Sequence, residues 1–243
     1  HLITVFDRSP SVTFEEFTDM LHDVADAIEH RAFISGIEQG GPVAFSTATF
    51  SSDSMAYRVL PTVIISDEES ARNAAQTLRD NVVSISDREY GGGTEMSLAL
   101  MAGNGMAKVC ESDLNSNDSP YAHDVRINIV SDFETSDSPS YLRDNILGQE
   151  RIEGLPYITI NALGLVPYPE DNEGKQHYTP GEGPMSASEM RAYAVNYVIG
   201  GPQHFEMMIE AGQDFGERFR QKIIMDLGFD YQSPSDEYSP LPG

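Results

Sequence analysis

Residues 2–17 read LITVFDRSPSVTFEEF, and this stretch decides the fold. Its first part is mostly apolar and rich in β-branched and aromatic residues, which predicts a buried strand that stops at Asp7. Thr13 and Glu16 then have the T-x-x-E spacing of a helix-capping box. Apolar residues recur every three or four positions after it, so a helix is expected to run as far as Gly36. A strand that leads into a helix in this way is the repeating unit of an α/β protein.

The rest of the chain repeats this alternation of strands and amphipathic helices. Residues 42–50 (PVAFSTATF) and 57–65 (YRVLPTVII) read as two strands joined by a short turn, which makes them antiparallel neighbours. Pro61 cannot donate a ladder hydrogen bond, so the second strand is expected at the edge of the sheet. Further strands are predicted at 125–130, 157–166 and 204–209, and further helices at 66–82, 94–110, 141–151, 186–199 and 215–227, with Ser66/Glu69 and Ser186/Glu189 as capping boxes. The predicted class is α/β, with a mostly parallel central sheet, one antiparallel edge strand and helices on both faces.

The chain is expected to form one domain, residues 1–228, because it shows no internal repeat and no second apolar core. Residues 167–185 are rich in proline, glycine and acid and are too long for an ordinary connection, so we interpret them as an insertion loop. Residues 229–243 form a Pro/Ser/Asp-rich tail that has little to bury.

Acidic side chains outnumber basic ones by 39 to 15, which gives a formal net charge of −24. Such a field repels nucleic acid and anionic lipid, so neither is expected as a partner. It favours cations, and two explanations stay open: adaptation to saline surroundings or solubility, and a surface loaded with cations. No apolar stretch approaches the ~20 residues of a membrane span, so no direct membrane insertion is expected.

The start of the sequence bears on the location of the protein, and its cysteine content limits the kinds of site that it can contain. The start, HLITVF, lacks the basic segment and cleavage site of a signal peptide, so the chain is either cytosolic or a mature form. Its one cysteine, Cys110, excludes an internal disulfide and a cysteine-based zinc site.

Oxygen-bearing side chains follow several of the predicted strands. Asp7, Ser9 and Ser11 form a D-x-S-x-S motif where the first strand ends, and an open α/β sheet binds ligands at that edge. Thr94 follows a glycine turn at the start of a helix, and Asp132 lies just past the strand at 125–130. Carboxylate and hydroxyl oxygens suit a hard cation such as Mg²⁺. Taken alone, D-x-S-x-S is more often a helix-capping turn than a metal site.

The full set matches a pattern known from one family. D-x-S-x-S, then G-G-T, then an aspartate after the next core strand resembles the metal-ion-dependent adhesion site of von Willebrand factor type A (vWA) domains. The segments 90–100 (YGGGTEMSLAL), 127–132 (INIVSD) and 196–223 (NYVIGGPQHFEMMIEAGQDFGERFRQKI) look like a bacterial vWA-like family of unknown function. The resemblance covers roughly residues 2–228 and implies a Rossmann-like vWA fold.

The resemblance also implies a function. It makes the five residues ligands of Mg²⁺, with Mn²⁺ or Ca²⁺ as alternatives, and it implies an adhesion-type module that engages an acidic side chain of a partner protein. Relatives in bacteria are usually exported, so a periplasmic or secreted mature form is expected. Pro10 departs from the family, which usually has glycine there. Its ring fixes the φ angle of this loop residue at about −65°.

Two other functions stay in competition. The domain is alternatively a structural subunit of a larger extracytoplasmic assembly, a homo- or hetero-oligomer with a vestigial metal site, as Pro10, the insertion and the tail suggest. A metal-dependent hydrolase is the weakest alternative, because no residue of the set is a base that could activate water. The histidines considered for that role are scattered through the sequence: His22, His30, His123, His177 and His204. We therefore expect a binding protein and no enzyme.

Overall fold

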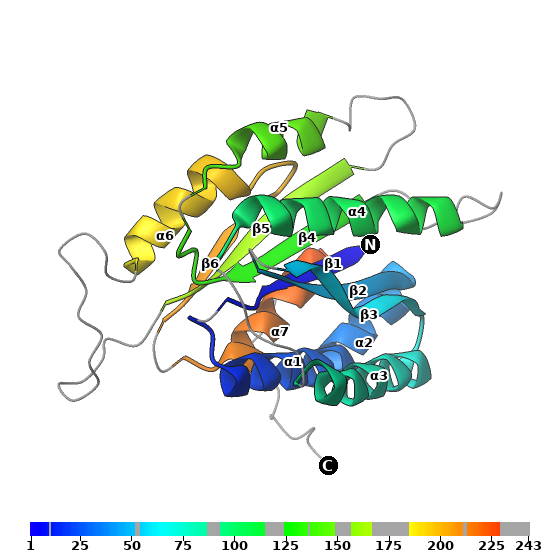
Figure 1. Cartoon of the computed structure of the whole chain (residues 1–243). Helices are drawn as coiled ribbons and strands as arrows, with labels where there is room; N and C mark the ends of the chain where they lie inside the picture. Colours follow the sequence, from blue (N-terminus) through cyan, green and yellow to red (C-terminus); the bar gives the residue numbers. More distant parts are fainter. Residues whose placement is uncertain are drawn as a thin grey trace, which may run out of the picture.

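In the part of the chain that the computed structural model describes, six strands form one sheet in the order β3-β2-β1-β4-β5-β6 (Figure 1). The described residues are 1–9, 11–51, 54–86, 93–114, 124–135, 137–148, 157–166, 185–210 and 213–228. The strands are β1 (Leu2–Asp7), β2 (Val43–Ser51), β3 (Ser54–Ile65), β4 (Asp124–Ser131), β5 (Tyr157–Leu165) and β6 (Glu206–Ile209). Every neighbouring pair is parallel except β2 and β3. This confirms the predicted α/β class and the antiparallel edge strand that contains Pro61.

Helices cover both faces of the sheet (Figure 1). One face carries α1 (Phe14–Glu29), α2 (Arg31–Gly40), α3 (Glu68–Ser86) and α7 (Phe215–Asp226). The other carries α4 (Met96–Leu114), α5 (Ser140–Gly148), α6 (Ala187–Tyr193) and the π-helical turn η2 (Ala194–Val198). Among the described segments, none of the helices could span a lipid bilayer.

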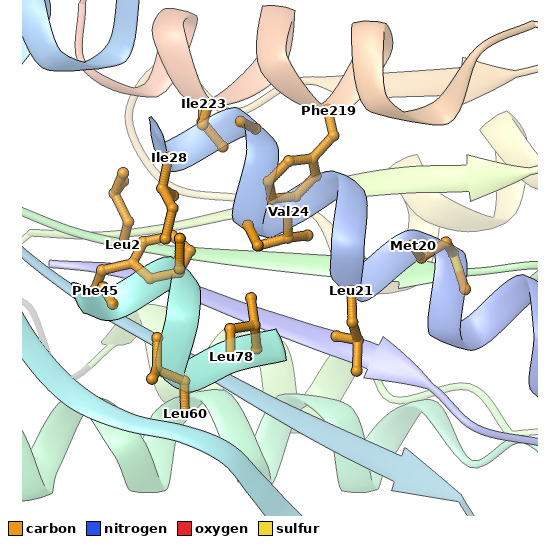
Figure 2. Packing of buried hydrophobic residues seen from close by; sticks show 14 of the residues in the cluster. Leu2, Met20, Leu21, Val24, Ile28, Phe45, Leu60, Leu78, Phe219 and Ile223 are labelled. Atoms are coloured by element: carbon orange, nitrogen blue, oxygen red, sulfur yellow. The ribbon is translucent and has the colours of Figure 1, made fainter. Parts of the chain in front are cut away.

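The alternation of side chains along β1 sends one apolar set to each face. Leu2 and Phe6 join the core under α1 and α7, whereas Ile3 and Val5 join the core under α4. Figure 2 shows the first of these cores, where Phe219 of α7 packs among side chains of α1 and the sheet. β1 is therefore buried on both faces, and its carboxyl end lies in the middle of the sheet.

The helix predicted to end at Gly36 is in fact two helices. His30 has an extended backbone (φ −66°, ψ 139°), which ends α1 at Glu29. Its ring Nδ1 accepts a hydrogen bond from the amide of Ala32 and thereby caps α2. The apolar spacing continues across this break, because both helices lie on the same core, and so the sequence did not reveal it.

Two other expectations about helix ends need correction. Helix α3 is capped by Asp67 and Ser70 and not by Ser66 and Glu69: the amide of Ser70 donates to Asp67 Oδ1 (2.8 Å) and the amide of Asp67 to Ser70 Oγ (3.0 Å). Asp67 is one residue closer to the first helical turn, and an aspartate is at least as good an N-cap as a serine. Thr94 lies just before α4, which begins at Met96.

The Ser186/Glu189 capping box of α6 is confirmed, with the Ser186 amide 2.9 Å from Glu189 Oε2. The helix does not stay regular to its end, because the amide of Ile199 reaches back to the carbonyl of Ala194 in a π-type hydrogen bond (2.9 Å). Gly201 follows with φ +89°, and a Cβ there would lie 2.2 Å from the carbonyl oxygen of Ile158. Only glycine allows this turn to pack against β5.

A buried polar network joins α7 to the sheet. Lys222 donates to Asp226 Oδ2 (2.6 Å) and to the side-chain oxygen of Asn128, and its ammonium lies 5.0 Å from the centre of the Phe205 ring. Asp226 also accepts from Nδ2 of Asn128 (2.8 Å) and of Asn161 (3.0 Å). Burial lowers the pKa of Lys222 to about 8, although Asp226 opposes the shift. The network fixes α7 against β4 and β5.

The proposed insertion at 167–185 and the tail at 229–243 lie outside the described residues, apart from Met185. The same holds for Pro10 and for the side chain of Cys110.

Candidate metal centre

Asp7 is the centre of the candidate site. It is the last residue of β1 and is only 1% exposed, because β2 and β4 flank the strand and helices cover both faces. Its Oδ1 accepts the backbone amide of Ser9 at 2.8 Å, the turn expected when an aspartate ends a strand. A buried carboxylate at this position can hold a cation or several hydroxyl groups.

Two further segments bring hydroxyl groups to the other carboxylate oxygen of Asp7. Thr94 Oγ1 donates to Asp7 Oδ2 at 3.2 Å, and Ser131 Oγ donates to the same atom at 2.6 Å. Thr94 comes from the segment before α4, and Ser131 ends β4, which pairs directly with β1. The structure therefore brings the predicted Thr94 to the predicted Asp7, and it adds Ser131.

The two serines of the D-x-S-x-S motif lie together. Their Oγ atoms are 2.8 Å apart, with Ser9 buried and Ser11 exposed. The hydroxyl of Ser9 also reaches the Asp7 carboxyl, where its hydrogen bond works against the raised pKa. Ser9 and Thr94 therefore meet at the same carboxylate, which is the geometry required by the adhesion-site hypothesis.

Asp132 completes the predicted set from the loop after β4. It is 8% exposed, and its Oδ1 accepts the amide of Glu134 at 3.0 Å. Between them, Phe133 has φ +54°, an uncommon conformation for a bulky residue. Its amide donates to Ser131 Oγ (2.9 Å) and its ring lies 5.9 Å from the ring of Tyr193, so the turn is held from both sides.

The electrostatics of the site favour a cation. Burial raises the pKa of Asp7 to about 6, and the negative charge of Asp132 adds to the rise. Hydrogen bonds from Ser131 and Ser9 oppose it. Burial and the charge of Asp132 also raise the pKa of Glu134. Two carboxylates that repel each other in a dry site are stabilised by a positive ion between them.

The donor set fits a hard divalent cation, because all five predicted side chains offer oxygen and none offers nitrogen or sulfur. The described residues contain no group of three or more His, Cys, Asp or Glu side chains placed to hold a metal. Any ion at this site would therefore depend on the hydroxyls as much as on the two aspartates. With one oxygen from each of the five side chains, a six-coordinate ion would keep one position for water or another ligand.

Asp137 is a second residue that the sequence did not reveal. Its Oδ1 accepts the amide of Met96 (3.1 Å) and its Oδ2 accepts the amide of Ser97 (2.8 Å), so it caps α4 from the neighbouring loop. Thr135 Oγ1 donates to it at 2.6 Å, and Thr135 pairs with Thr94 in an isolated parallel bridge. The signal in the sequence is only indirect. Thr94 is the one favourable capping residue just before α4, and its hydroxyl bonds to Asp7.

The sequence matches one family model. The family is described as protein of unknown function (DUF1194), and its model matches residues 1–230. No curated protein matches the sequence.

Several solved structures resemble the chain at low sequence identity. The pilus adhesin SpaC from Lactobacillus rhamnosus GG, in its open conformation, is 16% identical with a TM-score of 0.52, over 93% of this chain and 29% of that one. Proximal thread matrix protein 1 from the mussel byssus is 16% identical (TM-score 0.48), over 93% of this chain and 47% of that one. A structure of the same mussel protein with a zinc-occupied MIDAS motif is 14% identical (TM-score 0.47), with the same coverage.

The chain thus spans less than half the length of the solved proteins named above. The likeness to SpaC supports the α/β fold described above.

Proposed function

The chain belongs to the family described as protein of unknown function (DUF1194), and from that premise we propose that it is a metal-dependent protein-binding module. Asp7, Ser9, Ser11, Thr94 and Asp132 hold one divalent cation, Mg²⁺ in the first place and Mn²⁺ or Ca²⁺ as substitutes. The ion supplies an open coordination position for an acidic side chain of a partner protein. The protein acts outside the cytoplasm, in the periplasm or secreted, and it is not an enzyme.

One observation carries the proposal: the buried carboxylate of Asp7 collects hydroxyl groups from two other segments of the chain, Thr94 at 3.2 Å and Ser131 at 2.6 Å. Hydroxyl ligands are neutral, and the only carboxylates of the set are those of Asp7 and Asp132. Five oxygens from the set leave a six-coordinate ion one open position, which a third carboxylate can fill. The fold shared with a pilus adhesin is consistent with this use.

The first experiment titrates the protein with Mg²⁺ and Mn²⁺ by isothermal calorimetry. Wild type is expected to bind one ion, and Asp7→Ala to bind none. The matched control is Asp214→Ala, which removes an N-cap of α7 (Oδ1 to the Glu217 amide, 2.8 Å) outside the site and is expected to bind like wild type. Absence of binding to wild type, or equal binding by Asp7→Ala, rejects the proposal.

A second experiment tests the acid-binding step with acetate as the probe. Acetate should displace water from the Mn²⁺-loaded protein, which lowers the enhancement of water proton relaxation. An enhancement that does not change at saturating acetate means that the ion offers no open position, and the module would then not bind acidic side chains.

A further inference from the structure

The cap of helix α4 comes from an unexpected place. Thr94 precedes Met96, and in an isolated segment its hydroxyl would be the natural N-cap, accepting the amide of Ser97 three residues on. That amide donates instead to Asp137 Oδ2 at 2.8 Å, and the amide of Met96 donates to Oδ1 at 3.1 Å. The hydroxyl of Thr94 turns to Asp7.

Several contacts hold Asp137 in place. Thr135 Oγ1 donates to Oδ1 (2.6 Å), and the hydroxyl of Tyr193 donates to the backbone carbonyl of Asp137 (2.8 Å). Burial raises the pKa of the Asp137 carboxyl, but the hydrogen bonds from Thr135, Ser97 and Met96 together hold it below its ordinary value. The carboxylate is therefore charged at neutral pH, which also suits the positive end of the α4 dipole.

From this geometry we infer that Asp137 is a positioning residue of the proposed metal site. By capping α4 from the loop that follows Asp132, it releases the hydroxyl of Thr94 toward Asp7 and ties the two metal-binding segments together. The Thr94–Thr135 bridge is the second tie between the same segments. The inference rests on the proposed function, since it assigns Asp137 a part in the affinity for the ion.

The test compares Asp137→Ala with Asp214→Ala. Each variant removes an aspartate that caps the start of a helix. Each is expected to lower stability by about 1 kcal/mol. Partners behind metal ligands typically change affinity by about 10- to 100-fold, so the Kd for Mg²⁺ should rise at least about tenfold in Asp137→Ala and should stay within about twofold in Asp214→Ala. An unchanged Kd in Asp137→Ala, or an equal rise in both variants, overturns the inference.

Asp137→Asn keeps the size of the side chain and one acceptor oxygen, so its Kd should fall between those of wild type and Asp137→Ala. It also serves if Asp137→Ala does not fold. A raised Kd for Mg²⁺ in an Asn variant whose circular dichroism shows a native fold supports the inference, whereas wild-type affinity in the Asn variant counts against it.

A measurement without metal separates this inference from the proposed function. In metal-free protein, the ¹³C shift of the Thr94 methyl group should change in Asp137→Ala and stay the same in Asp214→Ala, and the amides of Met96 and Ser97 should exchange faster. If wild type binds no Mg²⁺, the proposed function fails while these signals still decide whether Asp137 positions Thr94. Unchanged signals overturn the positioning role.

Discussion

The hydroxyl oxygen of Ser131 lies 2.6 Å from Oδ2 of Asp7, and this hydrogen bond joins the ends of β1 and β4 across 124 positions of sequence. The distance is typical of a hydroxyl that donates to a charged carboxylate. The same serine accepts the amide of Phe133 at 2.9 Å. Ser131 thus favours the charged form of Asp7 and also holds the turn that presents Asp132.

Ser131→Ala should raise the pKa of Asp7 above its present value of about 6, because the hydrogen bond that stabilises the carboxylate is lost while burial remains. Affinity for Mg²⁺ at pH 7 should fall by about tenfold or more. A ¹³C titration of the Asp7 carboxyl and calorimetry measure the two effects. Ser46→Ala is the control, since Ser46 is also a buried strand serine, bonded to His1 at 2.9 Å. A pKa of Asp7 that does not move in Ser131→Ala contradicts the expectation.

Asp7→Asn should stabilise the metal-free protein at neutral pH. The folded pKa of Asp7, about 6, lies above its ordinary value of 3.8, so its contribution to stability is present below pH 3.8 and is lost as the pH rises through 6. Asparagine carries no charge and can still accept the amide of Ser9. The advantage of Asp7→Asn over wild type should grow between pH 4 and 7 to on the order of 2–3 kcal/mol.

Urea unfolding in EDTA at several pH values measures this difference. Excess Mg²⁺ should reverse the order at pH 7, because only wild type gains stability from the bound ion. An Asp7→Asn protein that is less stable than metal-free wild type at pH 7 would show that the charge of Asp7 does not destabilise the fold.

Most of the fold could be predicted from the sequence, since each strand and helix carries its own periodicity. The break at His30 could not, because α1 and α2 share one apolar face and the change of direction needs only one extended residue. The π-type turn at the end of α6 was also missed. The glycine turn at Gly201, which follows it, packs against β5, a contact between distant segments that the local sequence does not show.

The candidate site could be predicted where its residues form a local motif or follow a strand, as Asp7, Ser9 and Ser11 do. Ser131 and Asp137 were missed for a different reason. Each acts on a partner from another segment, and serine and aspartate are so common in loops that neither has a local signature. The register of β1 against β4 decides which side chain reaches Asp7, and no single segment of sequence contains that register.

Lys222→Met should destabilise the protein by about 3–5 kcal/mol, because it leaves the carboxylate of Asp226 buried without its ammonium partner. The double variant Lys222→Met/Asp226→Asn should recover part of this loss, since no buried charge remains. Chemical denaturation of the two variants and of wild type checks the order. If the double variant is the less stable of the two, the buried charge of Asp226 is not the cause.

Two glycines of α4 should respond to alanine in opposite directions. A Cβ at Gly105 meets nothing within 4 Å, so Gly105→Ala should stabilise the protein by about 0.5–1 kcal/mol. A Cβ at Gly103 would lie 2.5 Å from Cγ2 of the buried Ile127, so Gly103→Ala should destabilise it by about 1–3 kcal/mol. Thermal unfolding measures the stability of both variants. A gain of stability in both would mean that α4 lies farther from β4 than described.

The central place of β1 in the sheet bears on how the protein matures. β1 leaves the ribosome well before β4, one of its two neighbours in the sheet. A nascent chain that ends before β4 lacks Asp132 and cannot form the complete metal site. Under the proposed function, the ion therefore does not guide early folding. The fraction of molecules that hold the ion would instead report the fraction in which β4 has paired with β1.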